Sequence, residues 1–379
     1  MRWLLALATA AAVRAPPKDD RSLALWLLEP ARTVDEVRAG AETLAERPPT
    51  QPCDALALCM ASWAAAQKQQ GDLLAALAAK LAPRMSEAAD SPRCAEVLAN
   101  TARAFAVEAS RSAAPGEYKG LFAALEDACR AKRLAVDAGS FATISRSFAA
   151  AREVGACNND AAPFRGAAPA DVAGACLRSL EAHADSTKLG ADGDFAVYSA
   201  SDVIDQADAD ELLRLAADQW TASAASGDES NYRTSETASL RDAASRTSEA
   251  VDRVAARAAA LFGLPRSCCE TLQLVRYASP DAFYKPHLDC LDDAGQVLLG
   301  GQRVGTVLVY LNDVDAGGAT RFPALDLAVA PRALNAVAWA NVRADGLPDV
   351  RARHEALPTP RRKVAVNCWV RAFPGTDGL

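Results

Sequence analysis

The chain has 379 residues, of which 50% are apolar and 23% are charged, a composition typical of folded rather than disordered proteins. Its length is sufficient for two domains with separate cores. The formal net charge of −7 argues against a nucleic-acid-binding protein that works through a basic face. We also predict that the mature chain contains no membrane span, because no apolar run in it is long enough to cross a bilayer.

The first fifteen residues, MRWLLALATAAAVRA, have the features of a secretory signal peptide. One positive charge precedes an apolar run, which ends at Val13-Arg14-Ala15 in a form that favours cleavage. A buried first helix is the alternative interpretation. We predict that residues 1–15 are a signal peptide, so that the protein enters the secretory pathway and lies in the endoplasmic reticulum lumen or outside the cell. The ten cysteines are compatible with this oxidising environment, and we expect some of them to be oxidised.

Residues 24–182 are predicted to form a helical repeat domain. Three alanine-rich segments of this region resemble one another: 56–66, 98–108 and 141–151. Their aromatic residues, Trp63, Phe105 and Phe148, recur at intervals of 42 and 43 residues, and two of the segments are followed by a second similar helix. A helix pair that repeats near 40 residues is typical of an α-solenoid, in which each unit buries its apolar face on its neighbour. We therefore expect the three aromatic residues to lie in the core.

These units resemble the helical repeats of algal and organellar proteins, some of which bind RNA. Between residues 16 and 180 there are 19 Lys and Arg against 20 Asp and Glu, so the region has no basic excess to neutralise phosphates. We therefore expect a protein or peptide partner on the repeats rather than a nucleic acid.

The pattern changes near residue 183. Amphipathic helices are predicted at 208–220 and 247–262. They are followed by four short β-type runs separated by Gly, Pro and Asp: 271–278, 303–312, 334–341 and 363–373. Many short strands without helices between them favour an antiparallel sandwich or barrel. We place the domain boundary near residues 185–195 and the second domain at 190–379.

Histidine is rare in this chain, with residues only at positions 183, 287 and 354. His287 and Asp289, in the stretch FYKPHLDC, are two residues apart, so on a strand they would point to the same face. His354 is the only other histidine of the second half, and His183 is assigned no role. Two histidines and one carboxylate on one side of a metal are typical of non-haem Fe(II) sites that activate O2. These three residues are therefore candidate iron ligands; the alternative is that they are solvated or satisfied polar residues whose spacing arises by chance.

Three segments occur in the order typical of one family: LQLVRYASPDAFYKPHLDC, GQRVGTVLVYLNDVDAGGATRFP and HEALPTPRRKVAVNCW. Through them, residues 190–375 resemble the prolyl 4-hydroxylase branch of the 2-oxoglutarate- and Fe(II)-dependent dioxygenases. The resemblance implies a double-stranded β-helix, which is a jelly-roll core, with Fe(II) held by His287, Asp289 and His354. It also implies 2-oxoglutarate as co-substrate, L-ascorbate as a further cofactor, and hydroxylation of peptidyl proline to 4-hydroxyproline. The alternatives are hydroxylation of lysine or of a small molecule, and an inactive scaffold that binds peptides or RNA.

The same resemblance gives Lys363 a role, because the family uses a lysine shortly after the second histidine to bind the far carboxylate of 2-oxoglutarate. On its strand, Lys363 shares a face with Trp369 that we expect to line the barrel interior, where a cation can pair with a carboxylate. The segment between His354 and this lysine is one residue shorter than in relatives and lacks their glycine. Arg361 or Arg362 is therefore the alternative anchor.

Other candidate residues also follow from the resemblance. Tyr277 matches a tyrosine that hydrogen-bonds 2-oxoglutarate, and Thr320 is placed where it could contact the same co-substrate. Tyr284 matches a residue at the mouth of the substrate site, and Arg233 lies in a segment like the family's R-x-S sequence near the peptide groove. Trp369, on the inward face of the last strand, is also assigned to substrate binding. The alternative for Tyr277 and Thr320 is a purely structural position on a strand.

Overall fold

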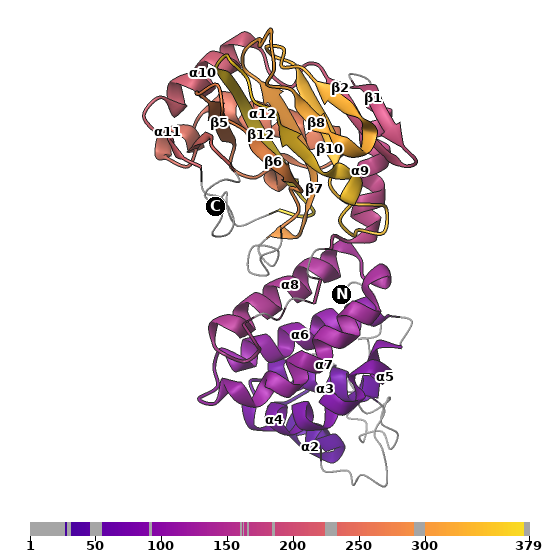
Figure 1. Ribbon diagram of the computed structural model, residues 1–379. Coiled ribbons are helices and arrows are strands. Elements are labelled where there is room, and N and C mark those ends of the chain that lie inside the picture. Colours follow the sequence, from indigo (N-terminus) through magenta and orange to yellow (C-terminus); the bar gives the residue numbers. More distant parts are fainter. Residues whose placement is uncertain are drawn as a thin grey trace. The chain divides into compact units, whose positions relative to one another are not determined.

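The computed structural model describes residues 27–28, 32–45, 55–90, 93–159, 161, 163–164, 167–183, 186–223, 233–291 and 300–374. The chain divides into two compact units, residues 1–165 and residues 166–379 (Figure 1). The signal peptide predicted at residues 1–15 lies outside the described residues. Among the helices that are described, none is long and apolar enough to cross a membrane.

The first unit is helical. Its described elements are α2 (Val34–Ala45), α3 (Ala55–Gln67), α4 (Gly71–Leu81), η2 (Ala82–Arg84), α5 (Met85–Ala89), α6 (Cys94–Ala109), η3 (Pro115–Tyr118), α7 (Lys119–Ala131), η4 (Arg133–Ala135) and α8 (Ala138–Glu153). Helices α3, α6 and α8 contain the three similar segments, and they pack in this order, α3 on α6 and α6 on α8. Phe105 and Phe148 are fully buried, as expected, whereas Trp63 is half-buried.

Helix α8 is stabilised by a side-chain cap at its N-terminus and by an aromatic contact with α7. Helix α8 begins after Asp137, whose carboxylate accepts a hydrogen bond from the backbone N–H of Ser140 at 3.0 Å and so caps the helix. The ring of Phe148 then meets Phe122 of α7 edge-on, with ring centroids 5.2 Å apart. The repeated aromatic position therefore joins neighbouring helices through their apolar faces.

The boundary between the units differs from the one predicted near residues 185–195. Helix α9 (Ala170–Ala182) was assigned to the helical repeats, but it belongs to the second unit. It contacts the sheet strands β1 (Ser186–Asp192), β7 (Arg303–Tyr310) and β10 (Ala336–Ala340). Its buried residues are Ala173, Cys176 and Leu180, so its apolar stripe is buried within the second unit.

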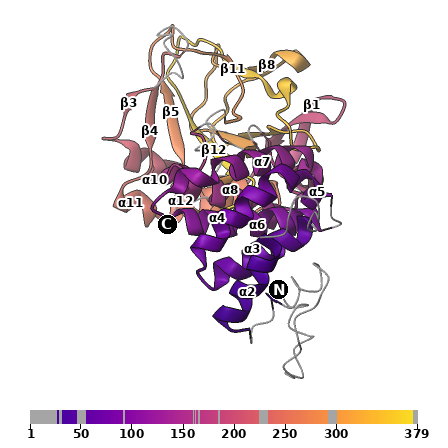
Figure 2. The same cartoon turned by 90° about the horizontal axis from the view of Figure 1, so that it is seen from below.

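The second unit is built on two antiparallel sheets. Its remaining strands are β2 (Phe195–Ala200), β3 (Thr221–Ala222), β4 (Glu236–Ser239), β5 (Gln273–Tyr277), β6 (Tyr284–His287), β8 (Thr320–Phe322), β9 (Leu327–Val329), β11 (His354–Ala356) and β12 (Lys363–Arg371). The larger sheet has the order β1-β2-β10-β7-β12-β5-β4-β3, and the smaller has the order β6-β11-β8-β9. Figure 2 shows β3, β4 and β5 together at one edge of the larger sheet. All four predicted strand segments are confirmed.

Helices cover one face of the larger sheet. Helix α12 (Glu249–Leu261) packs on β12, and α10 (Gln206–Ala216) packs on α12. The shorter helical elements of this unit are α11 (Ala243–Arg246), η5 (Arg266–Cys268), η6 (Pro323–Leu325) and η7 (Val350–Ala352). The fully buried carboxylate of Asp208 joins α10 to α12 by accepting hydrogen bonds from Arg253 at 2.8 Å and Arg257 at 3.2 Å. Gly305 of β7 makes room for this layer, since a Cβ there would lie 2.2 Å from the ring of Phe262.

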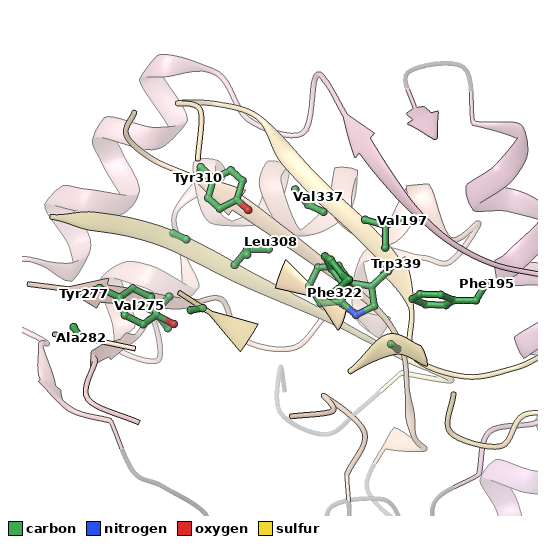
Figure 3. Close-up of a cluster of buried hydrophobic side chains, with 13 residues drawn as sticks. Phe195, Val197, Val275, Tyr277, Ala282, Leu308, Tyr310, Phe322, Val337 and Trp339 are labelled. Carbon is green, nitrogen blue, oxygen red and sulfur yellow. The ribbon is translucent and has the colours of Figure 1, made fainter. Parts of the chain in front are cut away.

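The opposite face of the larger sheet points toward the smaller sheet, and the core lies between them. Strand alternation puts Leu308 and Tyr310 of β7 on this inner face, next to Val337 and Trp339 of β10. Figure 3 shows these side chains in one cluster with Phe322, which comes from the smaller sheet. The inner face of the larger sheet and the facing strands of the smaller one therefore enclose the region in which the predicted site residues lie.

Candidate active site

The two histidines of the second unit lie on neighbouring strands of the smaller sheet. His287 ends β6 and His354 begins β11, and the two residues are direct partners in the antiparallel ladder, with ring centroids 4.3 Å apart. Asp289 follows β6, and its Oδ1 lies 3.8 Å from Nε2 of His287 while its Oδ2 lies 3.8 Å from Nε2 of His354. All three offer ligand atoms within 4.8 Å of one another. The three predicted metal ligands are therefore brought together.

The protonation of both imidazoles suits a metal. Nδ1 of His287 lies 2.8 Å from the carbonyl oxygen of Lys285, and Nδ1 of His354 lies 3.1 Å from that of Ala352. A carbonyl oxygen can only accept, so Nδ1 of each ring carries a proton and Nε2 is the nitrogen that can bind a metal. Burial, and then the neighbouring His354, lowers the pKa of His287, which keeps this imidazole neutral at physiological pH.

The carboxylate of Asp289 completes the set. Burial by itself would raise the pKa of Asp289, but His354, His287, Arg303 and a hydrogen bond from Thr306 together lower it below its ordinary value. The group is therefore an ionised carboxylate although it is only 8% exposed. Two imidazoles and one ionised carboxylate form the donor set that suits Fe(II), so the residues fit the metal that the sequence predicted.

Lys363 opens β12 and points into the core. Its side chain is 1% exposed, and Nζ donates a hydrogen bond to the carbonyl oxygen of Gly318 at 2.7 Å. Nζ lies 5.3 Å from the ring centroid of Tyr277 and 5.4 Å from that of Tyr310. No carboxylate of the described residues forms an ion pair with it, and burial lowers the pKa of Lys363 to about 7. The site therefore contains a buried amine that an incoming anion can pair with.

The two arginines proposed as alternatives to Lys363 are placed differently. Arg361 and Arg362 are both exposed, whereas Lys363 is buried. The segment before them is held by the turn at Gly317 and Gly318, whose φ angles are +70° and +66°. The N–H of Gly318 donates to the carbonyl oxygen of Pro358, so this turn supports the shortened segment that lacks its own glycine. The geometry therefore favours Lys363 as the anchor.

The other two residues predicted for the co-substrate lie in the same core region. Tyr277 is the ladder partner of Lys363 on β5, and burial raises the pKa of this phenol to about 12. Thr320 is 2% exposed and accepts a hydrogen bond from the hydroxyl of Tyr310 at 2.8 Å. Tyr310 was not predicted as a site residue, although its position on the inner face of β7 follows from strand alternation.

Two of the three residues predicted for substrate contact lie beside the histidines. The ring of Tyr284 stacks on His287 with centroids 3.5 Å apart and an interplanar angle of 19°. Arg233 pairs with Tyr284 in an isolated β-bridge and places its guanidinium 4.6 Å from the centre of the Tyr284 ring. The sequence placed both residues at the substrate side, and the structure brings them into contact with each other and, through Tyr284, with a metal ligand.

Trp369 belongs to a different cluster, which sequence reasoning missed. Its ring lies 3.7 Å from the guanidinium carbon of Arg303. Arg303 donates to both carboxylate oxygens of Glu270 at 2.8 Å, and Arg371 donates to the same carboxylate at 3.0 Å. Arg303 also lies 3.4 Å from the backbone carbonyl oxygen of Asp289. The cluster therefore connects β7 and β12 to the segment that carries the carboxylate ligand.

Among known protein families, the sequence model of the 2OG-Fe(II) oxygenase superfamily matches residues 272–371. Residues 272–371 thus resemble the 2OG-Fe(II) oxygenases. This family is named for Fe(II) and 2-oxoglutarate, and the matched residues include all three predicted iron ligands.

The oxygenase domain is similar to prolyl 4-hydroxylase subunits. The human protein named prolyl 4-hydroxylase subunit alpha-1 is 39% identical over 124 residues, which are 32% of this chain and 22% of that protein. Prolyl 4-hydroxylase subunit alpha-2 of Caenorhabditis elegans is 38% identical over 112 residues, 28% of this chain and 21% of that protein. The chain thus spans about a fifth of the length of these curated relatives. The predicted resemblance to prolyl 4-hydroxylases is confirmed.

Among solved structures, the viral collagen prolyl hydroxylase of Paramecium bursaria Chlorella virus-1 is similar to this chain, with 22% sequence identity and a TM-score of 0.38. The match covers 47% of this chain and 96% of that one.

Proposed function

We propose that the oxygenase domain hydroxylates proline residues of a peptide or protein at C4 and couples this reaction to the oxidative decarboxylation of 2-oxoglutarate. The observation that carries the proposal is the convergence of His287, Asp289 and His354, with ligand atoms within 4.8 Å of one another. Similarity to prolyl 4-hydroxylase subunits supports the choice of proline.

In this account the three ligands hold Fe(II), which when bound supplies O2 activation and the oxidation of an unactivated C–H bond. The protein's own part is to keep the imidazole of His287 neutral and the carboxylate of Asp289 ionised, and to hold Nδ1 of both histidines by backbone carbonyl groups. Phe322 and Trp339 pack against the ring of His354, with ring centroids 5.7 Å and 4.6 Å away, and so exclude water from that side. The ligand side chains are therefore held in one arrangement, and 2-oxoglutarate would bind beside them.

Lys363 is the proposed anchor for the far carboxylate of 2-oxoglutarate. A buried ammonium without an acidic partner is costly, and a dicarboxylate would supply the missing charge. Nζ has three donors, so it can keep its hydrogen bond to Gly318 at 2.7 Å and still donate to the ligand. Tyr277 and Thr320 are proposed to contact the same co-substrate, because they lie in the same buried region.

Tyr284 and Arg233 are proposed to contact the peptide. The Tyr284 ring is held flat against His287, so its aromatic surface lies next to the metal ligands, where a pyrrolidine ring could pack. Arg233 is only partly buried and can donate to peptide carbonyl groups next to that ring. Trp369 is also proposed to contact the substrate. Its ring is held in place by Arg303, whose guanidinium carbon lies 3.7 Å from the ring centroid.

We propose that the two sheets are the halves of a double-stranded β-helix. We also propose that the repeats of α3, α6 and α8 form a short solenoid that docks a protein partner. L-Ascorbate is proposed as a cofactor. Residues 1–15 are proposed to direct the protein into the secretory pathway, which predicts a mature N-terminus near Pro16.

The experiment that tests the function is a turnover assay of the purified protein. Fe(II), 2-oxoglutarate, ascorbate and a proline-rich peptide are supplied, and the peptide is analysed by mass spectrometry. We expect the gain of one oxygen atom on proline, with succinate formed in equal amount. Matched peptides with alanine or lysine in place of proline should stay unmodified. Oxidation of the lysine peptide alone would favour the alternative of a lysine hydroxylase, and no succinate with any substrate would favour an inactive scaffold.

A further inference from the structure

Thr306 is a buried threonine that contacts the carboxylate ligand directly. It lies on the inner face of β7, where its ladder partners are Trp339 on β10 and Trp369 on β12. The side chain is fully buried, and its hydroxyl donates a hydrogen bond to Oδ2 of Asp289 at 2.7 Å. It is the only polar side chain in the run from Val304 to Leu311 other than the phenol of Tyr310. A hydroxyl in this place has a specific partner.

A second buried residue fixes the direction of that hydrogen bond. Nδ2 of Asn341 donates to the hydroxyl oxygen of Thr306 at 2.9 Å. A hydroxyl has one proton, and an ionised carboxylate can only accept, so the proton of Thr306 must point at Asp289. The amide of Asn341 then has to present its NH2 group to Thr306. It does so although Oδ1 of Asn341 is buried and has no hydrogen-bond partner among the described residues.

The backbone of Asn341 ties this chain of hydrogen bonds to both segments that carry ligands. Its N–H donates to the carbonyl oxygen of Val304 on β7 at 2.9 Å. Its own carbonyl oxygen accepts from the N–H of Asp349, which precedes His354, at 2.9 Å, and from the thiol of Cys290, next to Asp289, at 3.3 Å. Asn341 is 1% exposed. It is thus a fixed point from which the amide can orient Thr306.

We propose that Thr306 and Asn341 are positioning residues that make Asp289 a one-oxygen ligand of the iron. The inference rests on the metal centre proposed above. Both carboxylate oxygens face a histidine, Oδ1 at 3.8 Å from Nε2 of His287 and Oδ2 at 3.8 Å from Nε2 of His354. Thr306 already donates a hydrogen bond to Oδ2, so Oδ1 is the oxygen left for the metal. A carboxylate free to rotate could bind with both oxygens and take a position that the 2-oxo acid needs, or could turn away from the metal.

The test is Co(II) binding to the metal-free full chain, measured by titration calorimetry, because Co(II) occupies such sites without turnover. Thr306→Val keeps the shape of the side chain and removes the donor, whereas Thr306→Ser keeps the donor. We expect Thr306→Val to raise the Kd for Co(II) about tenfold, and Thr306→Ser to stay within about threefold of wild type. Thermal unfolding of each metal-free variant checks that the fold is retained.

Asn341→Ala and the double variant distinguish positioning from a general loss of packing. If Asn341 acts through the hydroxyl of Thr306, Asn341→Ala weakens Co(II) binding in the wild-type background. It adds little when Thr306 is already valine, because the two residues act as one unit. Fully additive effects of the two substitutions on the Kd would overturn the proposed chain. Should Thr306→Val fold poorly, the Asn341→Ala variant decides by the same measurement, and an unchanged Kd overturns the inference.

A ligand variant separates this inference from the metal centre itself. His287→Ala should abolish measurable Co(II) binding. If it does so while Thr306→Val binds Co(II) within twofold of wild type, the metal centre stands and the positioning role is wrong. If His287→Ala binds Co(II) as wild type does, the metal centre itself is in the wrong place and the inference fails with it.

Discussion

His287 and His354 are direct partners across the antiparallel strands β6 and β11, so the register of this ladder sets the distance between their rings. The ladder is irregular immediately after this pair, between His354 and Ala356. A slip of one residue would turn His354 to the other face of the sheet, where it could not meet Asp289. The proposed centre therefore depends on the pairing of two short strands as much as on the identity of the ligands.

Replacing Lys363 tests the anchor for 2-oxoglutarate. We predict that Lys363→Ala raises the apparent KM for 2-oxoglutarate at least tenfold, equivalent to about 1.4 kcal/mol of lost binding. The reason is that the far carboxylate would lose the only ammonium buried in the described part of the core. The affinity for iron should change little, because Lys363 contacts none of the three ligands in the described hydrogen bonds.

The neighbouring arginines are the matched controls for this prediction. Arg361→Ala and Arg362→Ala remove a positive charge within two residues of Lys363, but both side chains are exposed. Each variant should stay within about threefold of wild type in KM for 2-oxoglutarate. A large effect in either arginine variant, with Lys363→Ala unaffected, would place the anchor in the turn before β12.

The buried amine also predicts a pH dependence of stability. The pKa of Lys363 is lowered from 10.5 to about 7 in the folded protein without ligand, so the unfolded chain binds more protons between these values. Stability attributable to Lys363 therefore rises with pH from about 7 to 10.5, and below about 7 the full cost of the buried charge is present. Lys363→Met removes this cost.

The measurement is the difference in free energy of unfolding between Lys363→Met and wild type, without 2-oxoglutarate, at several pH values. We expect the variant to be more stable at pH 7 and the difference to shrink steadily towards pH 10. A difference that stays constant over this range would show that Lys363 does not change its charge there.

The turn that supports the shortened segment should not tolerate a side chain. A Cβ at Gly317 would lie 2.5 Å from the carbonyl oxygen of Pro358, and its φ of +70° is in the left-handed region. We predict that Gly317→Ala destabilises the domain by about 1–3 kcal/mol in urea denaturation. Gly190→Ala, where a Cβ would be 3.4 Å from its nearest neighbour, should change stability by less than about 0.5 kcal/mol. Equal effects of the two substitutions would argue against the described turn.

Arg233 should influence the peptide and not the co-substrate. Its guanidinium lies over Tyr284 and donates to the hydroxyl of Ser235 at 2.6 Å. We expect Arg233→Ala to raise the KM for a proline-rich peptide about fivefold or more, roughly 1 kcal/mol, and to leave the KM for 2-oxoglutarate unchanged. Arg241→Ala, at an exposed position, is the control. If KM for the peptide stays at the wild-type value in Arg233→Ala, this residue does not contact the substrate.

Sequence patterns with short spacing predicted which candidate side chains lie close together or point inward. The pair His287 and Asp289 follows from strand alternation over two residues, and the inward direction of Lys363 follows from the same rule on β12. The choice between Lys363 and the adjacent arginines was left open by the sequence. Burial of Lys363 and exposure of both arginines favours the lysine. Alternation turns Arg362 to the opposite face, and Arg361 precedes β12, which begins at Lys363.

Contacts that depend on long-range pairing could not be predicted in this way. Thr306 and Asn341 are 35 positions apart and meet only because β7 and β10 are neighbours in the sheet. A threonine in an apolar strand is ordinary on β-propensity alone. Helix α9 shows the same limit at the level of domains. It follows the helical repeats directly in the sequence, and only the sheet on which it packs assigns it to the second unit.

The most direct test of the central claim compares wild type with His287→Ala, Asp289→Ala and His354→Ala in Fe(II)-dependent formation of succinate and hydroxyproline from a proline-rich peptide. We predict that each variant keeps the circular dichroism spectrum of the folded protein and forms neither succinate nor hydroxyproline. The reason is that two of these ligands without the third would not hold the iron in a productive arrangement. Unchanged turnover in any one variant would remove that residue from the site. Unchanged turnover in all three would contradict the proposed metal centre.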